Sequence, residues 1–87
     1  MIRILKRTGN FVDFNADKIS NAIIKAMKET KDGVDERLAN EISLKIEEEL
    51  SNRNFPIPVE MVQDLVENYL MDSVRKDVAK KYILYRY

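Results

Sequence analysis

The stretch ILKRTGNFVDFNADKI, residues 4–19, decides how the chain folds. Apolar and β-branched residues stand on both sides of Gly9-Asn10, a pair that favours a hairpin turn between two strands. Asn15 then supplies an N-cap, and Asp17 suits the first turn of a helix because its charge complements the helix dipole. The stretch therefore predicts a strand, a tight turn, a second strand and the start of a helix.

The turn of this hairpin determines which side chains face the rest of the molecule. Its two loop residues are either Thr8-Gly9 or Gly9-Asn10, and the residues alone leave both alternatives open. Both alternatives place Leu5, Val12 and Phe14 on one face. Because a lone two-stranded hairpin is marginal in water, we expect that face to pack on helices.

Hydrophobic periodicity predicts four helices after the hairpin. The first is stopped by Lys31-Asp32-Gly33, the second spans about residues 35–51, the third starts at Pro58, and Ser73 caps the fourth. The side chains expected to point inward recur three or four residues apart: Ile19, Ala22, Ile23, Ala26, Met27, Leu38, Ile42, Ile46, Leu50, Met61, Val62, Leu65, Val66, Tyr69, Leu70, Val74, Val78, Ala79, Tyr82 and Ile83.

Two further segments complete the predicted architecture. Glu47-Glu48-Glu49 indicates a solvated face near the end of the second helix. Residues 55–58 are expected to be extended, since residues before proline avoid the helical region, and a third strand formed there would be short and at an edge. The predicted fold class is α+β, with a small N-terminal hairpin capping a four-helix, bundle-like domain.

Composition limits the class of protein. The chain has 87 residues, 45% of them hydrophobic, and its 15 Lys and Arg balance 15 Asp and Glu. This size predicts one domain over residues 1–87, and the balance disfavours nucleic acid as a partner because duplex binders carry a basic excess. No membrane partner is expected, since no run approaches the roughly 20 apolar residues of a membrane span and no signal peptide opens the chain. We expect a cytoplasmic location, and the unterminated helix at Tyr85-Arg86-Tyr87 predicts a fragment of a longer chain.

A complete active site is not expected in these residues. With no Cys and no His, the chain lacks thiol nucleophiles, imidazole bases and the ligands of most transition-metal sites. Asp and Glu follow helix-surface spacing, so no catalytic carboxylate pair and no metal site stand out. The sequence also has no Gly-rich loop of the P-loop or dinucleotide type. We therefore expect a chain that is not itself an enzyme.

Positive charge gathers where phosphate could bind without such a loop. Lys6 and Arg7 precede the turn at Gly9, and Lys18 lies in the first turn of the helix that Asn15 caps. A helix N-terminus already carries partial positive charge and unpaired N–H groups, so further cations there are useful when an anion binds. The stretch is therefore predicted to hold a nucleotide's phosphates. The alternative is that all three cations are ordinary surface residues.

A cluster of aromatic and basic residues ends the chain: Tyr82, Tyr85, Arg86 and Tyr87. These side chains could stack on a base and contact phosphate. The alternative for Tyr82 is a place in the hydrophobic core, where an aromatic residue at helical spacing is commonly found.

The chain resembles the ATP-cone, the nucleotide-binding regulatory domain at the N-terminus of many ribonucleotide reductases. Four segments carry the resemblance in family order: Leu5-Lys6-Arg7-Thr8-Gly9; Phe14-Asn15 with Lys18-Ile19 and Ala22-Ile23; VEMVQDLVE at 59–67; and VAKKYILYR at 78–86. Together they cover nearly the whole chain. The chain departs from the family at Thr8, where Asp is common, and at Val12, where some members have Glu.

The resemblance implies a pocket between hairpin and helices in which ATP and dATP compete, with Mg²⁺. Residues 18–22 would frame the nucleoside, Val59 would line the pocket, and the C-terminal aromatic and basic residues would close it. Lys6, Arg7 and Lys18 would hold the phosphates. The full set of implied nucleotide-binding residues is Leu5, Lys6, Arg7, Gly9, Asn15, Lys18, Ile19, Ala22, Val59, Tyr82, Tyr85 and Arg86.

The function implied by the resemblance is allosteric. ATP or dATP would control the assembly, and hence the activity, of a ribonucleotide reductase of the anaerobic type, in deoxyribonucleotide synthesis for DNA replication. The implied partners are adenine nucleotides and the catalytic part of the reductase, and a homo-oligomer is left open. The alternative is a helical protein–protein interaction module without a nucleotide ligand. A small DNA-binding protein ranks behind both because of the charge balance.

Overall fold

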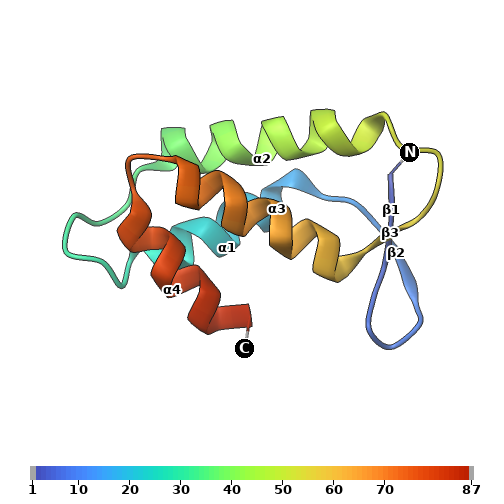
Figure 1. The fold of residues 1–87 in the computed structure, drawn as a ribbon, viewed down its shortest axis with the longest axis horizontal. Coiled ribbons are helices and arrows are strands. Elements are labelled where there is room, and N and C mark those ends of the chain that lie inside the picture. Colours follow the sequence, from blue (N-terminus) through green and yellow to red (C-terminus); the bar gives the residue numbers. More distant parts are fainter. Residues whose placement is uncertain (1, 87) are drawn as a thin grey trace.

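The fold is α+β, as predicted, and the computed structural model of the chain describes residues 2–86. The elements in order are β1 (Arg3–Leu5), β2 (Phe11–Asp13), α1 (Ala16–Met27), α2 (Glu36–Ser51), β3 (Ile57–Pro58), α3 (Val59–Asp72) and α4 (Lys76–Arg86). The four helices pack together, with the strands gathered at one end of the molecule (Figure 1). Tyr87 of the C-terminal cluster lies outside the described residues.

The sheet has three strands in the order β2-β1-β3. β1 runs antiparallel to β2 and parallel to β3, pairing Ile4 with Ile57 and Leu5 with Pro58. The predicted third edge strand is therefore confirmed, although it is only two residues long. Pro58 is tolerated because β3 has a free edge, and it also serves as the N-cap of α3.

The hairpin turn is longer than either predicted loop. The Lys6 N–H donates to the Asn10 carbonyl at 2.8 Å, and the Gly9 N–H donates to the Lys6 carbonyl at 2.9 Å, which leaves three residues in the loop. Gly9 has a φ of 88°, a left-handed conformation that a residue without a Cβ adopts without strain. This is the arrangement of a type I turn followed by a glycine bulge.

The longer turn changes which residues share a face of the hairpin. Ile4 pairs with Val12, and Leu5 pairs with Phe11. Directly opposed residues of antiparallel strands lie on the same face, so the prediction that Leu5 lies with Val12 and Phe14 was wrong. Ile4, which is only 7% exposed, takes the inner position instead. Val12 and Phe14 do share a face, because Phe14 directly follows β2 and is two residues from Val12.

The core lies between the four helices and is covered at one end by Ile4 and Ile57. Most of the side chains predicted to point inward are buried or partly buried there. Val74 is an exception, because α4 begins only at Lys76 and the preceding loop leaves Val74 95% exposed. In the acidic run predicted to form a solvated face, Glu48 is exposed and Glu47 and Glu49 are partly exposed, but one carboxylate oxygen of Glu49 is buried without a hydrogen-bond partner among residues 2–86.

The predicted cap of α1 is confirmed at Asn15, and Asp35 caps α2 in the same way. Asn15 Oδ1 accepts the Asp17 N–H at 2.9 Å, and Asp35 Oδ1 accepts the Leu38 N–H at 3.1 Å. α1 ends at Met27, one turn before the predicted stop. Buried hydroxyls of Ser20 and Ser43, 2.7 Å apart, join α1 to α2.

Arg75 fastens α4 to the loop between α1 and α2. Its Nη2 donates to Thr30 Oγ1 and to the Gly33 carbonyl, each at 2.9 Å, and its Nε donates to Asp77 Oδ1 at 3.1 Å. The hydrogen bond to Asp77 raises the pKa of Arg75 and lowers that of Asp77. No sequence pattern pointed to this clamp, because Thr30 and Gly33 stand more than 40 positions from Arg75.

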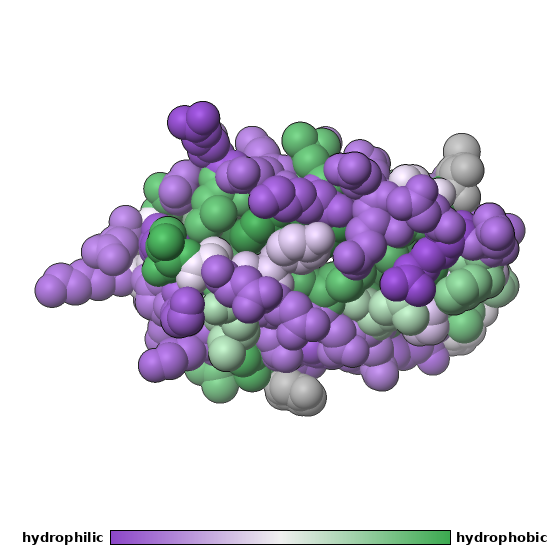
Figure 2. Space-filling view, turned by 45° about the horizontal axis from the view of Figure 1, so that its top comes forward, coloured by the Kyte–Doolittle hydropathy of each residue, from purple (hydrophilic) through white to green (hydrophobic). Residues whose placement is uncertain are grey.

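The surface is mainly polar. Figure 2 shows hydrophilic side chains over most of one face, with hydrophobic groups visible in patches between them. None of the helices in residues 2–86 combines the length and the apolar character needed to span a membrane.

Candidate functional site

A cleft of about 310 Å³ lies between the hairpin, the first turn of α1 and the start of α3. The hairpin contributes its inner face, because Ile4, Lys6, Val12 and Phe14 leave the strands on the same side. The residues lining the cleft are Ile4, Lys6, Val12, Asp13, Phe14, Asn15, Lys18, Ile19, Val59 and Val62.

Two of the three predicted phosphate ligands, Lys6 and Lys18, reach this cleft. Lys6 is positioned by the hydrogen bonds of the hairpin turn, and Lys18 by the helix start that Asn15 caps. Neither ammonium group forms a salt bridge with any residue from 2 to 86. Both charges are therefore free to meet an anion beside the positive end of α1.

The rest of the lining is largely apolar. Ile4, Ile19 and Val62 are buried at its base, with Phe14 partly buried and Val12 more open. An apolar wall next to two cations can accept a ligand that has a ring at one end and a multiply charged anion at the other. A nucleotide is a ligand of this kind.

Five of the twelve predicted binding residues line the cleft: Lys6, Asn15, Lys18, Ile19 and Val59. The lining residues that sequence reasoning missed are Ile4, Val12, Asp13, Phe14 and Val62. The correct hairpin register would have found Ile4 and Val12, since each is an even number of residues from Lys6 or Phe14 on the same strand face.

Arg7 lies beside the cleft, and another element holds it. Its Nε donates to Glu60 Oε1 at 3.2 Å, and its Nη2 donates to Gln63 Oε1 at 2.9 Å. Arg7 also lines a smaller hollow of about 190 Å³ with Leu5, Lys6 and Val59. Because Lys6 and Val59 line both spaces, this hollow adjoins the cleft.

The remaining predicted residues do not line the cleft. Gly9 shapes the turn, and Ala22 packs against the core from α1. Tyr82 is 8% exposed in the core, where burial raises the pKa of its phenol. The core alternative for Tyr82 was therefore the right one.

Tyr85 and Arg86 are occupied by contacts within the helices. The Tyr85 hydroxyl donates to the Lys25 carbonyl at 3.4 Å, and the Lys25 ammonium lies 5.4 Å from the Tyr85 ring centroid. Arg86 Nη1 lies 2.9 Å from Asp64 Oδ1 and 3.7 Å from Glu67 Oε1. These residues join α4 to α1 and α3, away from the cleft.

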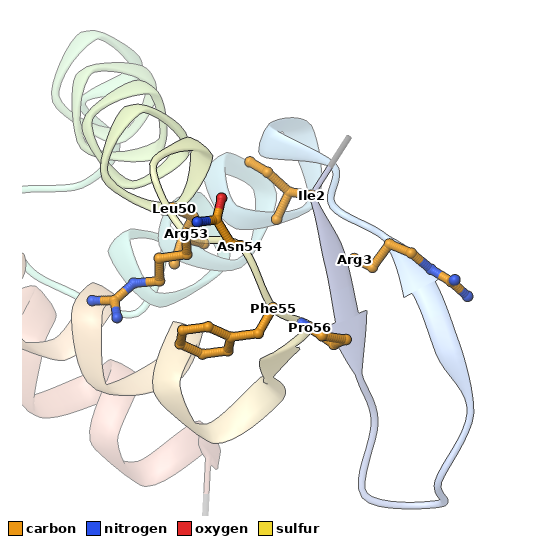
Figure 3. Close-up of a pocket in the computed structure, with 7 residues that line it drawn as sticks. All are labelled: Ile2, Arg3, Leu50, Arg53, Asn54, Phe55 and Pro56. Carbon is orange, nitrogen blue, oxygen red and sulfur yellow. The ribbon is translucent and has the colours of Figure 1, made fainter.

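A different hollow lies where the end of α2 meets the sheet, lined by Ile2, Arg3, Leu50, Arg53, Asn54, Phe55 and Pro56. Figure 3 shows the Arg3 and Arg53 side chains pointing away from one another. The Arg3 guanidinium lies 4.8 Å from the Phe11 ring centroid, on the outer face of the hairpin. This hollow therefore does not concentrate positive charge.

Residues 2–86 show no cluster of side chains that would bind a metal ion. No group of three or more Asp or Glu residues within 2–86 is placed to hold an ion. Asp13 supplies a carboxylate to the lining of the cleft, next to two cations and an apolar wall.

Several known proteins that resemble this chain are ribonucleoside-diphosphate or ribonucleoside-triphosphate reductases. It is 41% identical over 88 residues to the vitamin B12-dependent ribonucleoside-diphosphate reductase of Thermoplasma acidophilum, covering 95% of this chain and 11% of that protein. It is 38% identical over 95 residues to the ribonucleoside-diphosphate reductase subunit alpha of Chlamydia muridarum, covering 98% and 9%. It is 31% identical over 84 residues to the anaerobic ribonucleoside-triphosphate reductase of Escherichia coli, covering 97% and 12%.

The chain thus spans about a tenth of the length of these curated relatives. A sequence profile of the ATP cone domain matches residues 2–87, from the hairpin to the last helix. Since this match takes in both walls of the cleft and every helix, the chain belongs to the ATP-cone family.

Proposed function

We propose that the chain is a regulatory module that binds ATP or dATP in the cleft between the hairpin, α1 and α3. The observation that supports this most strongly is the pairing of the Lys6 and Lys18 ammonium groups, which form no salt bridge among residues 2–86, with an apolar wall in a member of the ATP-cone family. Occupancy of the cleft would control the assembly, and so the activity, of a ribonucleotide reductase.

In the proposed complex the phosphates lie against the ammonium groups of Lys6 and Lys18, beside the positive end of the α1 dipole. Charge-assisted hydrogen bonds of this kind are among the stronger polar contacts in proteins. The nucleoside lies on the apolar side of the cleft, beside Phe14, Ile19 and Val62. Mg²⁺ would arrive with the nucleotide, because it prefers phosphate oxygens and retained waters.

Regulation requires that the nucleotide distinguish two states of the larger protein. A ligand shifts such an equilibrium only by the difference in its affinity for the two states. ATP and dATP differ by one ribose hydroxyl, so the discrimination would depend on the part of the cleft nearest the ribose. The relatives include three kinds of reductase, and the proposal therefore specifies no reductase class.

Calorimetric titration with ATP and with dATP, each with Mg²⁺, tests the binding step. We expect saturable heat with one or both nucleotides and a higher melting temperature in their presence. Absence of heat and of thermal stabilisation at millimolar nucleotide would contradict the proposal. Sedimentation with and without dATP then tests the alternative of a ligand-free interaction module, which predicts self-association that nucleotide leaves unchanged.

A further inference from the structure

Arg7 differs from the two lysines of the cleft because α3 already holds its guanidinium. We infer that Glu60 and Gln63 compete with the ligand's phosphates for Arg7, and that these two residues thereby set the affinity of the cleft. The inference rests on the proposed nucleotide-binding function and adds two residues that lie outside the cleft's lining.

The position of the contact places it at the rim of the cleft. Arg7 directly follows Lys6, and Glu60 directly follows Val59, and both Lys6 and Val59 line the cleft. Arg7 and Glu60 both line the adjoining hollow, together with Lys6 and Val59 of the cleft. Arg7 therefore stands next to the cleft in which the proposed phosphates would bind.

The contact joins Arg7 to two residues on one face near the start of α3. Glu60 and Gln63 are three residues apart, so their side chains lie on the same helical face. Their two oxygens accept from Nε and Nη2 of a single guanidinium, at 3.2 and 2.9 Å. Such a two-point contact fixes the direction of Arg7, where a single pair would leave it free to rotate.

The contact is also weak enough to be exchanged. The side chains of Arg7 and Glu60 are 57% and 64% exposed, and exposed ion pairs contribute little net stability because water screens them. A guanidinium binds phosphate through parallel, charge-assisted hydrogen bonds, which are stronger. Glu60 does not need Arg7 as its only counter-charge, because it lies in the first turn of α3, where the helix dipole favours an anion.

The test is a double-mutant cycle on Arg7 and Glu60, read by calorimetric titration with MgATP and Mg-dATP. Glu60→Gln keeps the shape of the side chain and removes its charge, so we expect nucleotide affinity to rise about two- to fivefold, the range set by an exposed ion pair. In an Arg7→Ala background the same change should give no gain. Gln63→Ala should act in the same direction as Glu60→Gln.

A matched control separates this effect from a general change in charge. Glu41→Gln removes one carboxylate from α2, where Glu41 pairs with Lys45 at 3.8 Å and is 57% exposed, and it should leave affinity unchanged. Thermal unfolding of each variant checks that all of them fold.

Three results would overturn the inference, and they are distinguishable. If wild type binds nucleotide and Glu60→Gln binds equally well, the competition is absent while the proposed function stands. If the gain persists without Arg7, Glu60 repels phosphate directly and does not act through Arg7. If neither wild type nor any variant binds nucleotide, the proposed function fails and the inference fails with it.

Discussion

Lys6 and Lys18 stand twelve positions apart in the sequence, and the fold of the hairpin onto α1 brings both side chains to one cleft. If they hold phosphates, replacing either by Ala removes a charge-assisted hydrogen bond. We expect each change to weaken ATP and dATP binding by ~1–3 kcal/mol. Titration calorimetry at fixed salt measures this, with Lys45→Ala on α2 as a control that should bind like wild type. Unchanged affinity in both cleft variants would remove these lysines from the site.

Single residues also show where sequence reasoning stopped. The Gly9-Asn10 pair indicated a turn, but two- and three-residue loops both use a glycine there, and they differ by one position in register. A shift of one position moves every side chain of a strand to the opposite face, which is why Leu5 was assigned inward and Ile4 was missed. Lys6 was still predicted as a site residue, because that prediction rested on its charge and not on the face of the strand to which it was assigned.

Among the elements, the four helices could be predicted well because their apolar side chains recur at helical spacing. The side-chain contacts between different elements could not be predicted from the sequence. Arg7 and Arg86 were expected at the phosphates and at the mouth of the pocket, yet α3 holds both through the acidic residues Glu60, Asp64 and Glu67. These acids follow one another at intervals of four and three, which in sequence looks like an ordinary solvated face.

The clamp at Arg75 leads to a prediction about the helical part of the molecule. The Arg75 side chain is only 12% exposed and bonds Thr30, Gly33 and Asp77, so Arg75→Ala should lower the free energy of unfolding by about 2 kcal/mol. Urea unfolding measures the change. Lys76→Ala, next to it on an exposed site, should cost much less. Equal, small effects of both substitutions would mean that the clamp adds no stability.

The same clamp predicts a dependence on pH. Its hydrogen bond lowers the pKa of Asp77 in the folded state below the ordinary value of 3.8, so the unfolded chain takes up the proton first as the solution becomes acidic. The stabilisation is complete above pH 3.8 and is lost as the pH falls through the lowered folded-state pKa. In Asp77→Asn this part of the acid dependence should be missing.

For the molecule as a whole, the sheet is the part that a ligand could change most. All three residues of β2 are exposed, and within residues 2–86 β2 pairs with β1 alone, so β2 has few buried contacts to resist local opening. A nucleotide in the cleft would touch the hairpin, α1 and α3 together. Binding should therefore couple the hairpin to the helices. This coupling is the simplest way for a nucleotide in the cleft to alter the surface of the domain.

Amide hydrogen exchange tests that coupling. Without nucleotide, amides of residues 6–13 should exchange much faster than those in the middle of α2, which is buried along one side by Ile42 and Ile46. Saturating ATP or dATP with Mg²⁺ should slow exchange in the hairpin and in the first turn of α1, because opening there requires release of the ligand. The Lys18→Ala variant at the same nucleotide concentration should show less protection. If protection instead appears equally in every element, the ligand stabilises the fold globally and the hairpin has no special part in the response.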